Sequence, residues 1–286
     1  MAKIPILIVH GPRHHGWPEL PFAMQSMFDA TGRFNVAVSL SPSLEASQEE
    51  WEAWRPKFSD FEAVVQLSEG CDWSEDLRSD FEAYVNSGGG VLVHHSTTSA
   101  FENWGAYQDI IGMGQPWRAW RRISQGYRIT INDATGEVVR TRPDHGIGPT
   151  HGTKHEFLIK SRLPDHPIVN GIPNEWMHGE DELYHVQRGP AENIEILASA
   201  YSAKEEKGTG EHEPVLWTVT YGKGRVFASV LGHGPEAVHC VGHQTYLARG
   251  LEWAATGAVT IPVPEGFPDE KKVSIVDPED VQWSSS

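Results

Sequence analysis

The stretch Gly88-Gly89-Gly90-Val91-Leu92-Val93-His94-His95 predicts a glycine turn followed by a buried strand that ends in two histidines. A continuous apolar run bounded by glycines is typical of a strand covered on both faces. Before it, Ser74 has the position of a helix N-cap, and a helical pattern runs from there to Val85. Helix, turn and buried strand in this order form the repeating unit of an α/β fold.

The same alternation extends along the N-terminal part of the chain. Strands are predicted at 4–10, 34–40, 61–67 and 91–95, and helices at 20–28, 47–57, 74–85 and 101–111. Strands that alternate with helices form a parallel sheet with right-handed crossovers and helices on both faces. We therefore expect an α/β fold whose sheet is mostly parallel.

The middle of the chain predicts a β-rich insertion. Strands are expected at 125–131, 156–160, 181–187 and 194–200, and segments 214–221 and 224–231 form a hairpin across Tyr221-Gly222-Lys223-Gly224. A final amphipathic helix at 244–255 ends before Gly257. We therefore expect one domain over residues 1–257 and an extended tail, rich in proline and charge, over 258–286.

The charge of the chain argues against nucleic acid as a partner. The 286 residues carry a formal net charge of -16, and binding to phosphates needs a clustered basic footprint. The basic cluster Arg118, Arg121 and Arg122 is interpreted as a solvated loop in this acidic background.

The lengths of the apolar runs and the number of cysteines bear on where in the cell the protein is found. No apolar run approaches the roughly 20 residues that cross a bilayer, and the N-terminal run at 4–10 is too short for a signal peptide. Cys71 and Cys240 are too few for a disulfide framework. We therefore expect a cytoplasmic protein with no membrane partner.

Histidines follow three of the predicted strands. The loop after the first strand carries His15 and Trp17, the fourth strand ends at His94-His95, and His233 follows the hairpin. Ligands of parallel α/β sheets bind outside the carboxyl ends of the strands, so we expect a ligand site where these histidines meet. Neighbouring residues of a strand point to opposite faces. One of His94 and His95 therefore faces the shared pocket, and the sequence leaves open which.

Two further segments carry side chains suited to chemistry. His151 and His155 are four residues apart, which on a helix would set both on one face as in zinc proteases. Gly152 and the strand pattern that follows make a loop equally compatible. The segment His178-Gly179-Glu180-Asp181-Glu182 places carboxylates beside a histidine, and carboxylates act as general bases or bind metals. On composition alone, a solvated acidic turn is the commoner interpretation of that segment.

Several catalytic motifs are missing from the sequence. It has no Gly-x-Ser-x-Gly elbow, no Gly-x-Gly-x-x-Gly and no phosphate loop, so no nucleotide cofactor is expected. Neither Cys71 nor Cys240 ends a predicted strand before a helix. Nucleophilic catalysis by cysteine is therefore not expected.

Segments along nearly the whole chain together resemble the ThuA-like family, named for trehalose utilisation. They are His15-Gly16-Trp17, Gly88 to His95, His151 to Phe157, Asp165-His166-Pro167-Ile168, Trp176-Met177-His178, Asp181-Glu182-Leu183-Tyr184, Glu213-Pro214, Gly222 to Phe227, Leu231-Gly232-His233 and Glu252 to Gly257. None is specific alone. Their order and joint presence carry the resemblance.

The resemblance implies a flavodoxin-like sheet of the class I glutamine amidotransferase superfamily. It also implies a role in carbohydrate catabolism, beside sugar dehydrogenases that make 3-keto-glycosides. Amidotransferases carry a cysteine nucleophile after the strand that here ends in His94-His95, and this chain has His95-Ser96 instead. Glutaminase chemistry is therefore not implied. The polar positions that match the family are His15, His95, Glu182 and His233.

We therefore expect an enzyme that acts on a glycoside or keto-sugar, with His15, His95, Glu182 and His233 as its catalytic set. These side chains could hold Zn²⁺ or Mn²⁺, which would polarise a carbonyl or hydroxyl. A metal-free version, with histidines as acid and base, stays open. The residues expected to bind the substrate are Trp17, Trp104, His151 and His155, and Trp117 and Trp120 are further candidates for stacking on a sugar ring.

Two other functions stay open. A non-catalytic sugar-binding or regulatory module would use the same pocket without an acid–base pair. An amidase or protease-like activity is disfavoured by the missing nucleophile. The expected partner is a small-molecule carbohydrate, and the sequence leaves a homo-oligomer open.

Overall fold

The computed structural model describes residues 2–13, 17–101, 103–114, 126–142, 150–190 and 192–283. The helices are α1 (Leu20–Ala30), α2 (Gln48–Ala53), α3 (Glu75–Ser87), α4 (Gly105–Ile111), α6 (Pro235–Val238) and α7 (Val241–Thr256), with 3-10 turns η1 (Phe58–Asp60), η2 (His95–Ser99), η3 (Lys204–Glu206) and η4 (Pro278–Asp280). The strands are β1 (Ile4–His10), β2 (Phe34–Leu40), β3 (Ala63–Leu67), β4 (Gly90–His94), β5 (Tyr127–Ile131), β6 (Val138–Thr141), β7 (Thr150–His151), β8 (His155–Ser161), β9 (Glu175–Asp181), β10 (Tyr184–His185), β11 (Arg188–Gly189), β12 (Ile194–Tyr201), β13 (His212–Tyr221) and β14 (Gly224–Ser229). The predictions for His15, Trp117, Trp120 and the basic cluster at 118–122 lie outside the described residues.

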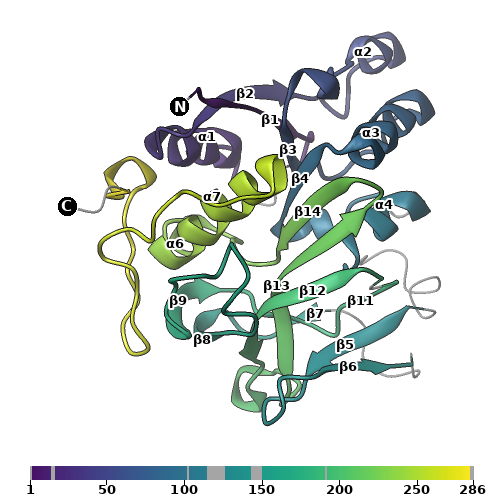
Figure 1. Ribbon diagram of the computed structural model, residues 1–286. Coiled ribbons are helices and arrows are strands. Elements are labelled where there is room, and N and C mark those ends of the chain that lie inside the picture. Colours follow the sequence, from purple (N-terminus) through teal and green to yellow (C-terminus); the bar gives the residue numbers. More distant parts are fainter. Residues whose placement is uncertain are drawn as a thin grey trace.

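Twelve strands form one mixed sheet whose two halves differ in strand direction (Figure 1). Strands β2, β1, β3, β4 and β14 lie side by side and run parallel. From β14 onward, β13, β12, β8 and β9 follow with antiparallel pairing. Strands β5, β6 and β11 pair off this path, and β7 and β10 form a separate two-stranded sheet. The expected parallel sheet is thus one half, and the β-rich segment continues the same sheet.

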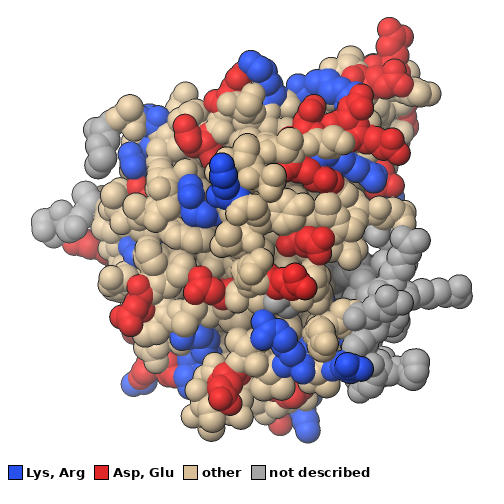
Figure 2. Space-filling model, turned by 45° about the vertical axis from the view of Figure 1, so that its right-hand side comes forward, with Lys and Arg blue, Asp and Glu red and all other residues tan. Residues whose placement is uncertain are grey.

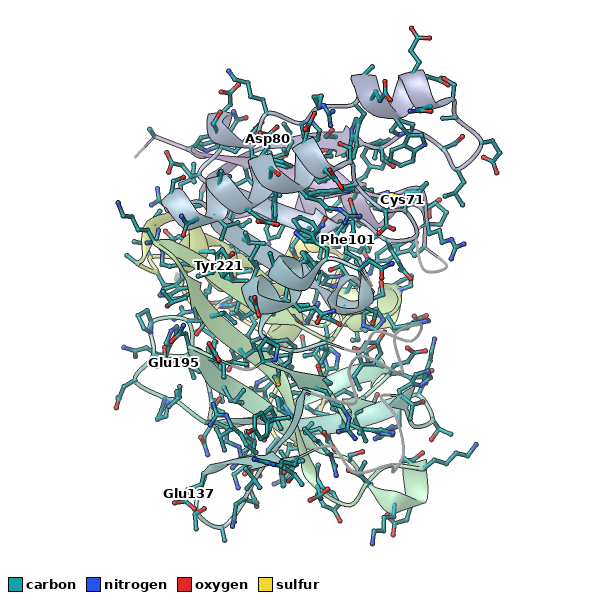
Figure 3. The ribbon with its side chains drawn as sticks, turned by 90° about the vertical axis from the view of Figure 1, so that its right-hand side faces the viewer. Cys71, Asp80, Phe101, Glu137, Glu195 and Tyr221 are labelled. Atoms are coloured by element: carbon teal, nitrogen blue, oxygen red, sulfur yellow. The ribbon has the colours of Figure 1, made fainter. Side chains whose placement is uncertain are left out.

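The strands of the parallel half are apolar because they are covered on both faces. Every residue of β3 and β4 is buried, as in other parallel sheets. Helices α3 and α4 cover one face, and α1 and α7 cover the other (Figure 1). In Figure 3, Cys71, which follows β3, and Tyr221, which ends β13, lie at opposite ends of the sheet. The carboxyl edge of the parallel strands is therefore on the side of Cys71.

Local signals explain where several elements begin and end. Ser74 is the N-cap of α3, and its hydroxyl accepts the Leu77 N–H over 3.3 Å. Tyr221 pairs with Gly224 across the predicted hairpin turn. The strand predicted at 181–187 is not continuous, since β9 ends at Asp181 and β10 contains only two residues.

The antiparallel half curls back onto the parallel half. Strand β9 is four positions from β14 in the sheet order, which in a flat sheet is about 19 Å. Yet the Gly232 N–H, just after β14, donates to Asp181 Oδ2, at the end of β9, over 2.7 Å. Register shifts between β12 and β13 and between β8 and β9 mark irregularities of the β-bulge type, which bend strands and increase their twist. The curl brings the end of β9 to the carboxyl edge.

Residues 258–283 pack against their own chain. The Met177 N–H donates to the Asp269 carbonyl over 2.8 Å, Ile275 forms a β-bridge with Cys240, and Trp283 is buried. The segment covers part of the outer edge of β9, which would otherwise expose unpaired backbone groups.

Acidic and basic side chains are interspersed on the face shown in Figure 2. Among the coloured residues of that face, Lys and Arg do not gather in one broad patch of the kind that binds a phosphate backbone. Within the described ranges, no helix combines the length and the apolarity needed to cross a membrane.

Glu252 of α7 anchors the start of the C-terminal segment. Its buried carboxylate accepts the backbone N–H groups of Thr260 and Ile261 over 2.6 and 2.9 Å, and the Arg33 guanidinium over 2.6 Å. Burial alone would raise the pKa of Glu252, but the hydrogen bonds from Thr260, Arg33 and Ile261 outweigh it and lower that pKa.

We predict that Glu252→Gln lowers the free energy of unfolding by about 3 kcal/mol at pH 7. The change breaks a buried ion pair and places a side-chain NH₂ group, itself a donor, against groups that also donate. Since folding lowers the pKa of this carboxyl, its contribution is present above the pKa of the unfolded chain and is lost as the pH falls through the folded pKa. Urea unfolding at neutral and acidic pH checks both points, with the exposed Glu45→Gln as control. Equal stability of the two variants at pH 7 would refute the anchor.

Candidate active site

The candidate site is a pocket at the carboxyl edge of the parallel strands. It holds about 330 Å³ of empty space, its open mouth included. Its lining includes His10, Arg13, Trp17, Glu69, His95 and His233. These residues come from the ends of strands and the loops after β1, β3, β4 and β14, where sheets of this kind bind ligands.

His95 follows β4 in a backbone conformation that is costly for any residue except glycine. Its φ is 44°, and strained residues of this kind concentrate at functional sites. The Nδ1 atom lies 2.8 Å from the Val230 carbonyl. Because a carbonyl only accepts, Nδ1 carries a proton, and in the neutral ring Nε2 has the lone pair. The Tyr184 hydroxyl therefore donates to Nε2 over 3.1 Å, and the two rings lie 4.6 Å apart.

His94 and His95 both line the pocket, but only His95 belongs to the group around Glu182. The Nε2 atom of His94 lies 3.4 Å from Nε2 of the buried His243. Burial lowers the pKa of His94 to about 4 in spite of the nearby Asp181 carboxylate, so the ring is neutral at pH 7. Gly232, with φ 106°, passes these two rings, and a Cβ at this position would collide with both.

Glu182 brings a buried carboxylate from the antiparallel half of the sheet. It directly follows β9 and is 6% exposed. Its Oε1 lies 3.2 Å from His233 Nε2 and 3.6 Å from His151 Nε2, and its Oε2 lies 3.9 Å from His95 Nε2. Three imidazoles from separate segments therefore surround one carboxylate.

Lys154 fixes the proton of His233. Its ammonium lies 2.6 Å from His233 Nδ1. An ammonium has protons to donate and no lone pair, so Nδ1 accepts and the ring proton is on Nε2. That proton points to the Glu182 carboxylate. Lys154, His233 and Glu182 thus form a chain of donors and acceptors in one direction.

The same group has the composition of a metal-binding site. One ligand atom from each of His95, Glu182 and His233 lies within 4.8 Å of the other two, and among the described residues this is the one group of three or more such side chains. Two histidines and a glutamate are also the protein ligands of one class of catalytic zinc sites.

A second cluster of titratable residues lies in the core behind the site. His178 Nε2 donates to Asp181 Oδ2 over 2.9 Å, and Cys240 is close to the same imidazole. Burial alone would lower the pKa of His178, but Cys240 and Asp181 outweigh it and raise that pKa to about 9. Burial would likewise raise the pKa of the Cys240 thiol, but His178 and the N–H groups of His243 and Gly179 outweigh it and lower that pKa.

The predicted substrate-binding residues divide into two groups. Trp17 lines the pocket, and His151 lies beside Glu182. Trp104 and His155 lie elsewhere. The ring of Trp104 is buried against Trp73 and Phe101, so its flat face packs in the core and cannot stack on a sugar. Phe101 is labelled in Figure 3. His155 begins β8, and its Nδ1 donates to the Thr153 carbonyl over 2.8 Å, away from the pocket lining.

Tyr184 and Lys154 contact His95 and His233, although the sequence predicted neither of them as a site residue. Tyr184 follows Glu182 by two residues, and alternate residues of an extended segment share a face. That spacing is a signal that could have singled it out. Lys154 lies between His151 and His155 and carries no comparable signal.

The comparisons with known proteins agree on the family. The family model for trehalose utilisation, ThuA, matches residues 5–254. A ThuA-like protein from Parabacteroides merdae has 35% sequence identity and a TM-score of 0.90, over 97% of this chain and 99% of that one. No curated protein matches the sequence.

A more distant structure shows the fold alone. A ThuA-like protein from Bacteroides uniformis has 16% identity and a TM-score of 0.55, over 90% of this chain and 95% of that one. The extent of the family match and the identity to the Parabacteroides protein lead to one conclusion: this chain belongs to the ThuA trehalose-utilisation family.

Proposed function

We propose that this chain is an enzyme of carbohydrate catabolism that acts on a glycoside or 3-keto-sugar by acid–base chemistry. The observation that carries the proposal is the convergence of His95, Glu182 and His233, of which His95 and His233 line the pocket. A carbohydrate role agrees with the family to which the chain belongs. A catalytic role would also account for the strained backbone of His95, because strain of this kind concentrates at functional sites.

The hydrogen bonds support a different role for each side chain. His95 Nε2 is an acceptor, now used by the Tyr184 hydroxyl, and a substrate C–H or O–H could give its proton to the same nitrogen. His233 Nε2 carries a proton that it can deliver to a substrate oxygen, while the Lys154 ammonium passes a proton to Nδ1 so that the ring stays neutral. Glu182 orients the rings and stabilises positive charge on them.

The pocket wall suits a sugar ring. Trp17 offers a flat apolar face, and Arg13 and Glu69 offer a donor and an acceptor for hydroxyl groups. We expect one ring of the substrate to occupy this pocket.

We predict that His95→Gln and Glu182→Gln each lower kcat on a 3-keto-glucoside by about 10²–10⁴-fold, with KM within a few-fold, since proton transfer fails while binding persists. His155→Gln is the matched control, because this side chain is outside the pocket. Steady-state kinetics with 3-keto-glucosides, the unoxidised glucosides serving as comparison, checks the prediction. A wild-type protein that binds these sugars without turnover would support a non-catalytic sugar-binding module instead.

A metal-assisted version of the same site is the second candidate, supported by the 4.8 Å limit on the ligand-atom distances. Zn²⁺ or Mn²⁺ held by His95, Glu182 and His233 would supply Lewis acidity toward a carbonyl or hydroxyl. One feature opposes it. Coordination through His233 Nε2 needs the ring proton on Nδ1, where Lys154 donates.

We therefore predict that Lys154→Met raises the affinity for Zn²⁺ by about tenfold or more, in the range found when groups hydrogen-bonded to a metal ligand are changed. Isothermal titration of chelator-treated protein with Zn²⁺ measures it. Lys160→Met is the control, because Lys160 pairs with Asp133 instead of His233. Unchanged affinity in Lys154→Met would show that the ammonium does not restrict the site.

A further inference from the structure

The carboxylate of Asp181 is the point where the two halves of the site meet. Its Oδ1 accepts the N–H groups of Glu182 over 2.8 Å and of His233 over 3.0 Å. Its Oδ2 accepts the Gly232 N–H over 2.7 Å and His178 Nε2 over 2.9 Å. The side chain is fully buried, and all four donors are protein groups.

These four bonds join segments that the chain keeps far apart. Glu182 belongs to the turn after β9, and Gly232 and His233 belong to the loop after β14. The backbone N–H groups of Glu182 and His233, two proposed catalytic residues from these separate segments, therefore donate to the same oxygen, Oδ1 of Asp181. A shift of that oxygen would move Glu182 and His233 relative to each other.

His178 holds the carboxylate from the core side. Its ring packs against Phe157 and Trp176 at centroid distances of 5.2 and 5.8 Å, which limits its rotation. Cys240, at the start of α7, is the next group beyond it. A cysteine, a histidine and an aspartate in this order have the composition of a hydrolytic triad.

Burial separates this trio from a catalytic one. Cys240 and His178 are 0% exposed and Asp181 is 1% exposed, and neither Cys240 nor His178 lines the pocket. A nucleophile has to reach its substrate. The trio therefore serves another purpose than attack by the thiol.

We propose that Asp181 and His178 are positioning residues, which fix Glu182 and His233 at their working separation and orientation. The proposal rests on the function proposed above, because that function makes Glu182 and His233 the reacting groups. Supporting residues of this kind hold reacting groups within a fraction of an ångström of the productive geometry.

The test is Asp181→Asn, read out without substrate and then with it. An amide has one acceptor oxygen and turns an NH₂ group toward donors, so at least one pair of bonds is lost. We expect amide exchange at Glu182, Gly232 and His233 to become about tenfold faster or more. We also expect the ¹⁵N shifts of the His233 ring to move from a protonated Nε2 toward a mixture of tautomers. On a 3-keto-glucoside we expect kcat to fall about 10–100-fold with KM little changed.

Two variants keep the proposal open to refutation. Glu252→Gln lowers stability at a site remote from the pocket, so it shows what loss of stability alone does to exchange and tautomer. If Asp181→Asn does not fold, His178→Phe keeps the ring packing and removes the donor, and the Gly232 amide, which shares Oδ2, is expected to lose its protection. Exchange rates and ring shifts equal to those of Glu252→Gln would overturn the proposal.

The two proposals fail in different ways. Wild-type protein without turnover would remove the proposed function, while the exchange and ring measurements would still decide whether Asp181 positions its neighbours. Normal turnover in Asp181→Asn would remove the positioning proposal and leave the function intact.

Discussion

The hydrogen bond from the Gly232 N–H to Asp181 Oδ2 closes the sheet on itself. Four strand positions separate β14 from β9, so the bond can form only if the antiparallel half bends far out of the plane of the parallel half. Without that bend, Glu182 would lie at a distant edge of the sheet. The meeting of Glu182 with His95 and His233 therefore depends on the bend between the two halves of the sheet.

The curvature has identifiable causes. Strand β12 shifts register twice against β13, around Ala198, and β8 shifts against β9 between His155 and Phe157. Each extra residue bends its strand and adds twist. Strand β14 adds the change of direction, since it pairs in parallel with β4 and antiparallel with β13. The histidine side of the site thus comes from the parallel half, and the carboxylate comes from the bent half.

The sequence predicts the parallel half well, because each strand there carries its own continuous apolar run and each helix its own cap or glycine stop. The position of His95 at a strand end also followed from this pattern, as did the choice of Glu182 and His233 from the family resemblance. The prediction that Trp104 binds the substrate was wrong, because its indole is buried in the core. A sequence alone does not distinguish a tryptophan that packs between two helices from one that stacks on a ligand. The bulges, the curl and the contact of Lys154 with His233 depend on residues far apart in the chain, and local patterns do not encode them.

The C-terminal segment supplies backbone partners to the start of α7. The Val241 N–H donates to the Ser274 carbonyl, and the Val276 N–H donates to the His239 carbonyl, so the start of α7 is held by residues 33 and 37 positions later in the chain. A nascent chain that ends at residue 257 already contains every side chain of the site. It still lacks the backbone partners that seat Cys240 and the first turn of α7. The first turn of α7, and Cys240 with it, therefore gains its full set of backbone partners only from a segment made after every histidine of the site.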